Sequence, residues 1–113
     1  MVATTDTVLC NGALDGSLRD VITSHLFRHA DRPLRFLDVG SGGGRRSRLI
    51  VQHLLRHPQS QFTGLDDWPD KSIRKQRVQQ LTGPTAELIA GNVHEQLWNL
   101  SMQERQFDMA RVV

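Results

Sequence analysis

The sequence is poor in the residues that mark several large classes of protein. Its 113 residues include a single cysteine, Cys10, so no disulfide can form within the chain, and we expect a reducing, cytoplasmic setting. No run of 18 apolar residues occurs, so we expect no membrane-spanning helix and no membrane partner. Residues 1–6 lack the basic and apolar stretches of a secretory signal, and we expect none.

Aromatic residues are also scarce, at 5% of the chain, and tyrosine is absent. Stacking of bases on aromatic rings supplies much of the affinity for single-stranded nucleic acids, so we do not expect a nucleic-acid partner. The net charge is only +2, but the cations gather in two clusters: Arg45, Arg46 and Arg48, and then Lys71, Arg74, Lys75 and Arg77. We interpret both clusters as solvated helix faces.

The length and the 38% hydrophobic content fit one domain with a modest core. In residues 14–30 apolar side chains recur at helical spacing, which predicts an amphipathic helix that Pro33 prevents from continuing. We therefore divide the chain into an N-terminal segment over 1–33 and a second unit over 34–113.

Strand and helix patterns alternate in the second unit. Short apolar runs predict strands over 35–39, 61–65, 86–90 and 107–113. Helical spacing and flanking Gly or Pro predict helices over 45–57, 70–81 and 94–101. In the first two helices the predicted inner residues are Leu49, Ile50, His53 and Leu54, and then Ile73, Val78 and Leu81, with Asp70 as the cap of the second. The alternation is typical of an α/β fold with an open parallel sheet of about four strands and right-handed crossovers.

The most informative segment is Leu37-Asp38-Val39-Gly40-Ser41-Gly42-Gly43-Gly44, a glycine loop between a predicted strand and a predicted helix. Glycine lets the backbone approach a ligand closely, and the start of the helix offers free N–H groups. The dinucleotide fingerprint G-x-G-x-x-G/A fits at Gly40 and Gly42, but its third position is Arg45, which argues against NAD.

The pattern Asp-x-Gly-x-Gly-x-Gly over residues 38–44 resembles motif I of the class I, Rossmann-like, S-adenosylmethionine-dependent methyltransferases. Gly64-Leu65-Asp66-Asp67, Gly91-Asn92-Val93 and Phe107-Asp108-Met109 resemble later parts of the family pattern, in the family's order. The resemblance covers residues 34–113. It implies a partial S-adenosylmethionine-binding domain in this part of the chain.

The resemblance also implies roles for individual residues toward S-adenosyl-L-methionine. Asp38 would lie below the loop of Gly40, Ser41, Gly42 and Gly44 and would hold the methionine end of the cofactor. Asp66, with Asp67 as the alternate, would accept hydrogen bonds from the ribose hydroxyls. Asn92 would face the adenine amino group, and Val93 would offer its backbone N–H to the ring. Asn92 departs from the family's usual acid.

Several roles stay open. Trp68 fits a place beside the adenine or a packing role equally well. Arg45 and Arg46 fit contact with the cofactor carboxylate or exposure to solvent. The residues suggest no catalytic constellation, so no catalytic residue is predicted. The pairs His25/His29 and His53/His57 have a spacing found in zinc sites, but a third ligand and the accompanying Glu are missing, so no metal is expected.

The family fold usually has seven strands in the order 3-2-1-4-5-7-6, and the chain stops inside the fourth. We therefore expect a truncated donor half whose last strand has an open apolar edge, and self-association through that edge. The expected function is methyl transfer from S-adenosylmethionine to a small-molecule acceptor. A weaker resemblance of residues 57–113 to histamine-type amine N-methyltransferases suggests an amine. The alternative is a non-catalytic α/β module that binds a nucleotide or another protein.

Overall fold

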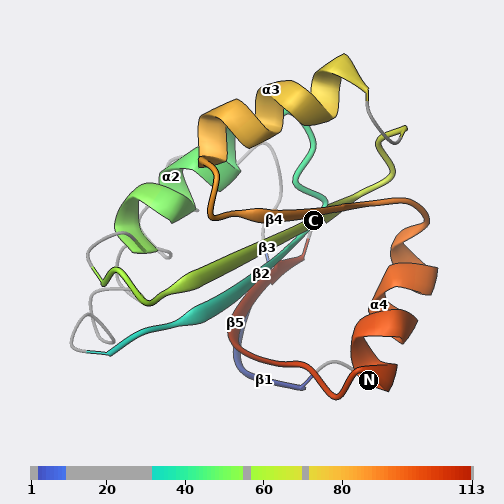
Figure 1. Ribbon diagram of the computed structural model, residues 1–113. Coiled ribbons are helices and arrows are strands. Elements are labelled where there is room, and N and C mark those ends of the chain that lie inside the picture. Colours follow the sequence, from blue (N-terminus) through green and yellow to red (C-terminus); the bar gives the residue numbers. More distant parts are fainter. Residues whose placement is uncertain (1–2, 10–31, 55–56, 70–71, 113) are drawn as a thin grey trace.

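Five short strands form one parallel sheet in the order β1-β5-β2-β3-β4 (Figure 1). The computed structural model describes residues 3–9, 32–54, 57–69 and 72–112. The strands are β1 (Ala3–Leu9), β2 (Arg35–Val39), β3 (Gln61–Asp66), β4 (Glu87–Ala90) and β5 (Gln106–Val112). The α/β class and the four predicted strands are thereby confirmed, and β1 is an addition that the sequence did not reveal.

Three described helices cover the two faces of this sheet (Figure 1). They are α2 (Arg45–Leu54), α3 (Ile73–Thr82) and α4 (Val93–Met102). The first two lie side by side on one face, and α4 lies on the other. The helix predicted over 14–30 and Cys10 lie outside the described residues.

Each face of the sheet has its own apolar core, because successive strand residues point to opposite faces. Under α2, the rings of Phe36 and Phe62 stack with their centroids 6.2 Å apart, beside Ile50 and Met109. Under α4, the core includes Leu37, Val39, Leu65, Leu100 and Ala110. Full burial of a side chain such as Leu or Phe stabilises a fold by about 1.5–3 kcal/mol, so these two layers hold the helices to the sheet.

The helix boundaries and inner faces differ in detail from the predictions. The first helix is described over Arg45–Leu54, residues 55–56 lie outside the described residues, and residue 57 is no longer helical. Val51 is buried beside Ile50 and Leu54. The predicted cap Asp70 lies outside the described residues. The observed cap of α3 is Ser72, whose Oγ accepts a hydrogen bond from the backbone N of Lys75 at 3.1 Å.

Ile73 was predicted to face the sheet, but it is 70% exposed. Val78, five residues further along the same helix, is completely buried. At 3.6 residues per turn, positions five apart point roughly 140° away from each other, so they cannot share one inner face. The prediction for Ile73 is therefore wrong.

The expected open edge on the last strand is also wrong, because β1 pairs with β5 in parallel along its outer side. The register runs from Ala3 opposite Gln106 to Leu9 opposite Val112. The backbone N–H and C=O groups on this side of β5, which could otherwise pair with another chain, pair with β1 within the sheet. Self-association through this strand therefore loses its structural basis.

We predict that β1 keeps the chain monomeric by covering β5. Replacing residues 3–9 with a Gly/Ser segment of equal length should expose the edge beside the buried residues Phe107, Met109 and Ala110. Light scattering after size exclusion should then show dimers or larger species where the unchanged chain runs as a monomer. A monodisperse, folded variant would show that the pairing with β1 does not protect the edge.

Candidate functional site

The glycine loop connects the carboxyl end of β2 to the start of α2. Gly40, Gly42 and Gly44 have φ values of 87°, 59° and 89°, a left-handed conformation that other residues adopt at a cost. The backbone N–H groups of Gly40 and Ser41 both donate to the carbonyl of Leu65 in β3, at 2.8 and 3.1 Å. The loop is therefore tied to the carboxyl end of the neighbouring strand.

The C-terminal end of the loop packs closely against helix α3. A Cβ at Gly44 would lie 3.2 Å from both methyl groups of Val78 in α3. The carbonyl of Gly44 accepts from Arg48 N at 2.8 Å, so this residue also begins the hydrogen bonding of α2. Gly43 differs, since nothing lies within 4 Å of its Cβ position.

Asp38 is completely buried beneath the loop, and side chains from three elements converge on its carboxylate. Ser41 in the loop and Ser47 in α2 donate their hydroxyls to Oδ2 at 2.9 and 2.5 Å. Arg111 donates its Nε to Oδ1 at 2.5 Å. The position below the loop agrees with the expectation for Asp38. Through these hydrogen bonds Asp38 positions the loop from within.

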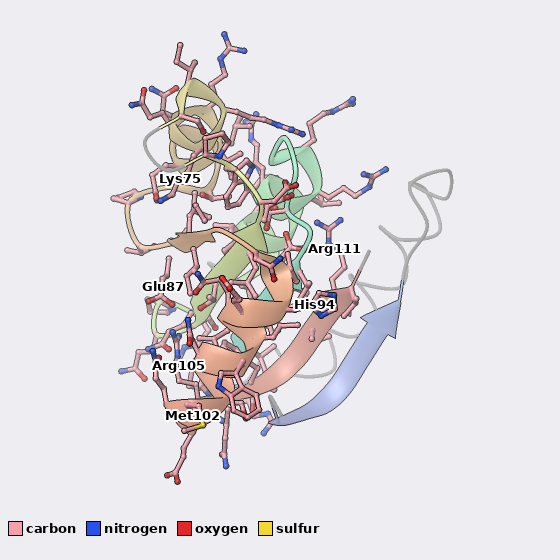
Figure 2. All side chains as sticks on the ribbon, turned by 90° about the vertical axis from the view of Figure 1, so that its right-hand side faces the viewer. Lys75, Glu87, His94, Met102, Arg105 and Arg111 are labelled. Atoms are coloured by element: carbon pink, nitrogen blue, oxygen red, sulfur yellow. The ribbon has the colours of Figure 1, made fainter. Side chains whose placement is uncertain are left out.

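Arg111 is a residue whose importance the sequence analysis missed. It stands directly opposite Asp38 in the register between β2 and β5, and it is only 1% exposed. Figure 2 shows it near the end of β5, well away from Arg105 and Glu87 at the other end of the sheet. A signal was present: Asp38 and Arg111 are charges of opposite sign within two otherwise largely apolar strand segments.

Ser47 and Gly64 were missed as well. A Cβ at Gly64 would lie 2.7 Å from the Oγ of Ser41, so only glycine leaves room there for the hydroxyl that reaches Asp38. The hydroxyl of Ser47 is completely buried with the same carboxylate. Ser47 belongs to no recognisable sequence motif, and Gly64 was quoted only as part of the motif that ends in the two acids, because both requirements arise from packing between elements.

The two acids at the end of β3, Asp66 and Asp67, lie in different environments. Asp66 accepts a hydrogen bond from the backbone N of Gly42 through Oδ2, and from Asp67 N through Oδ1 at 2.7 Å. Asp67 is exposed, and the pKa of its carboxyl is raised by a hydrogen bond with Asp66 and by the repulsion between the two charges. Asp66 is therefore the acid that the structure brings to the glycine loop.

Trp68 packs into the protein rather than lying open at the surface. It is 3% exposed, and its Nε1 donates to the carbonyl of Gly42 at 2.7 Å. Together with Asp66 it holds both backbone polar groups of Gly42, the N–H and the carbonyl. Of the two interpretations left open for Trp68, the contacts favour the packing role.

Asn92 and Val93 lie at the start of α4, after β4. Asn92 caps the helix by accepting from Glu95 N at 3.1 Å, and Val93 packs against the core on the α4 face. The backbone N of Gly91 donates to the carbonyl of Asp66 at 3.0 Å, which places this turn beside the end of β3. The contacts of Asn92 and Val93 with adenine stay a prediction.

The remaining candidates are more dispersed. Arg45 is exposed at the start of α2 and Arg46 is half-buried beside it. Within the described ranges, no three His, Cys, Asp or Glu side chains gather in a way that could hold a metal ion, and no helix is long and apolar enough to cross a membrane. Two shallow depressions, of about 290 and 450 Å³, are lined by residues at the opposite end of the sheet and along α3.

The chain matches no protein-family model, no curated protein and no solved structure. The site must therefore be interpreted from its own geometry.

We predict that Arg111→Met destabilises the fold by about 3–5 kcal/mol, because it leaves the buried Asp38 carboxylate without its counter-charge. Arg35→Met is the matched control: Arg35 pairs with Asp108 at 3.3 Å but is 47% exposed, so its loss should cost about 0–1 kcal/mol. Urea unfolding followed by circular dichroism measures both.

A second arm of the same experiment tests the cause. Asp38→Asn/Arg111→Met removes both charges, so it should be more stable than Arg111→Met alone. A double variant less stable than that single one, or equal losses for Arg111→Met and Arg35→Met, would show that the charge pairing is not what matters.

Proposed function

We propose that the chain binds S-adenosylmethionine at the glycine loop and is the donor half of a methyltransferase. One observation carries the proposal: the N–H of Gly42, in the loop after β2, meets the carboxylate of Asp66, at the end of β3. A glycine loop that lets a ligand approach the backbone closely thereby lies next to an acid that could accept hydrogen bonds from hydroxyl groups. The two lie at the ends of neighbouring strands. This is the juxtaposition that a nucleoside requires for binding.

The topology supports this site. From β2 the chain proceeds to β3 and β4 on one side, whereas β5 lies on the other side of β2. In open parallel sheets, ligands bind outside the carboxyl ends of the strands at such a switch point. Strands β4, β3, β2 and β5 lie in the order that the methyltransferase resemblance implies for its first four strands, and β1 stands where the family has its fifth.

The residues also fit the ribose part of the cofactor chemically. An ionised carboxylate offers about four lone-pair positions, and the backbone N–H groups of Gly42 and Asp67 use two of those on Asp66. A Cβ at Gly42 would lie between two side chains, 3.8 Å from Nη2 of Arg74 and 3.9 Å from Oδ2 of Asp66. The absence of a side chain at residue 42 therefore leaves space next to the acid, which a ribose could occupy.

The residues offer fewer free hydrogen-bonding groups to the methionine part of the cofactor. Both oxygens of Asp38 already accept from Ser41, Ser47 and Arg111, and the side chain is fully buried. This observation favours a second candidate function, a non-catalytic module that binds the nucleoside alone. In the first candidate, bound S-adenosylmethionine supplies the methyl group, and the acceptor is a small-molecule amine as the sequence resemblance suggests.

Calorimetric titration of the full chain with S-adenosylmethionine, S-adenosylhomocysteine and adenosine separates the two functions. Tighter binding of the two larger ligands than of adenosine would support recognition of the methionine end and hence the donor role. Equal affinities would support the nucleoside module. No binding of any of the three would contradict both.

We predict that Asp66→Ala weakens S-adenosylhomocysteine by about tenfold or more, because hydrogen bonds to a charged acceptor contribute roughly 1.5–3 kcal/mol. Asp67→Ala is the comparison, since that side chain is exposed and it is Asp66 that accepts from the loop. The same titration measures both variants. A larger loss for Asp67→Ala would assign the ribose to the neighbouring residue instead.

We also predict that Gly42→Val abolishes binding of S-adenosylhomocysteine. A side chain at this position would enter the space beside Asp66, and its φ of 59° disfavours a branched residue. Gly43→Val is the comparison, because its Cβ position is open. Thermal unfolding checks that both variants fold. Unchanged affinity in a folded Gly42→Val protein would remove the loop from the site.

A further inference from the structure

The helices α2 and α3 carry an unbalanced positive charge. Neither contains any of the chain's twelve acidic residues, and together they hold six of its fourteen cations, Arg45, Arg46, Arg48, Arg74, Lys75 and Arg77. The sequence places them in two separate clusters. In the structure α2 and α3 pack against each other, so the clusters form one surface (Figure 1).

Four of these arginines, Arg45, Arg48, Arg74 and Arg77, are exposed, and we call the surface that they form the basic face. Figure 2 shows nitrogen-tipped side chains extending outward from these two helices. The opposite face of the sheet differs, because α4 contains no Lys or Arg and one acid, Glu95. The small net charge of the whole chain thus conceals an asymmetry between its two faces.

The arrangement is unfavourable for the isolated protein. An ordinary solvated helix alternates charges so that residues three or four apart attract, whereas here Arg45 and Arg48, and also Arg74 and Arg77, are like charges three apart. Arg45 and Arg46 also begin α2, where the helix dipole disfavours cations. A bound polyanion would relieve both kinds of repulsion, which is the physical reason to look for one.

We propose that the basic face binds the phosphate backbone of duplex nucleic acid, without sequence preference. The dimensions fit: each helix has 10 residues and spans about 15 Å, a length over which a duplex carries about nine negative charges. The described aromatic side chains on this side of the sheet, including Trp68, are buried. They are not available to stack on bases, which points to backbone recognition of a duplex.

A membrane surface is the competing polyanion, and the structure favours it less. Helices that lie on membranes bury an apolar face in the lipid in addition to their cations. The exposed large apolar residues among the described ones are Ile73, Trp98, Met102 and Val112, and of these only Ile73 belongs to α2 or α3. Of the apolar side chains of α2, Ile50, Val51 and Leu54 are turned to the core instead.

The test uses the full chain and a fluorescein-labelled DNA duplex of about 20 base pairs, with binding followed by fluorescence anisotropy. If about four phosphates are neutralised, raising the salt from 50 to 200 mM should weaken binding on the order of a hundredfold. Arg48→Gln/Arg77→Gln should lower affinity at 50 mM salt by tenfold or more and reduce the salt slope by about two. Neither residue is part of the proposed cofactor site, so failure here leaves that proposal intact.

The matched control is Asn99→Asp/Gln103→Glu, which removes the same two units of charge from exposed positions at the end of α4. It should change affinity by no more than about twofold, because screening limits charge effects between distant faces. Equal weakening by both pairs, or no duplex binding at 50 mM salt, would overturn the proposal. Binding to vesicles of phosphatidylcholine and phosphatidylserine but not to the duplex would also overturn it, in favour of a membrane surface.

Discussion

The buried ion pair between Asp38 and Arg111 is the interaction on which the candidate site depends. It joins β2 to β5 across the point where the strand order reverses. Through Ser41 and Ser47 the same carboxylate also holds the glycine loop and the first turn of α2. Two charges withdrawn from water are tolerated only when each is well paired. The loop, the helix and both strands must therefore adopt their positions together.

Above this pair, the glycine loop is positioned by contacts at its middle residue. Asp66 is the last residue of β3, and Trp68 follows it two residues later. Asp66 accepts a hydrogen bond from the N–H of Gly42, and Trp68 donates one to the carbonyl of Gly42. The two peptide units on either side of the Gly42 Cα are thus oriented by one short segment of chain. The loop's conformation therefore depends on the end of β3 as much as on the loop's own glycines. Gly64 in β3 contributes as well, because its lack of a side chain leaves room for Ser41.

The sequence predicts those features that depend on local pattern, and it does not predict those that depend on register. The strands at 35–39 and 61–66 and the loop between β2 and α2 follow from apolar runs and glycine. The partnership of Asp38 with Arg111 arises only when residues 73 apart in the chain come into register. The pairing of β1 with β5 is similarly long-range, and residues 3–9 lack the uniform apolar character that marked the other strands. The cap at Ser72 was missed because Asp70 offered an equally good local signal.

The position of β5 has a consequence for how the chain reaches its native state. The most C-terminal of the described strands lies inside the sheet, between β2 and the most N-terminal of them. Ala3 cannot pair until its partner Gln106, more than a hundred residues further along the sequence, has left the ribosome. Until then β2 has an open side and β1 has nothing to pair with. Such distant pairings slow folding, so nascent chains of this protein have an extended period in which chaperones can act on them.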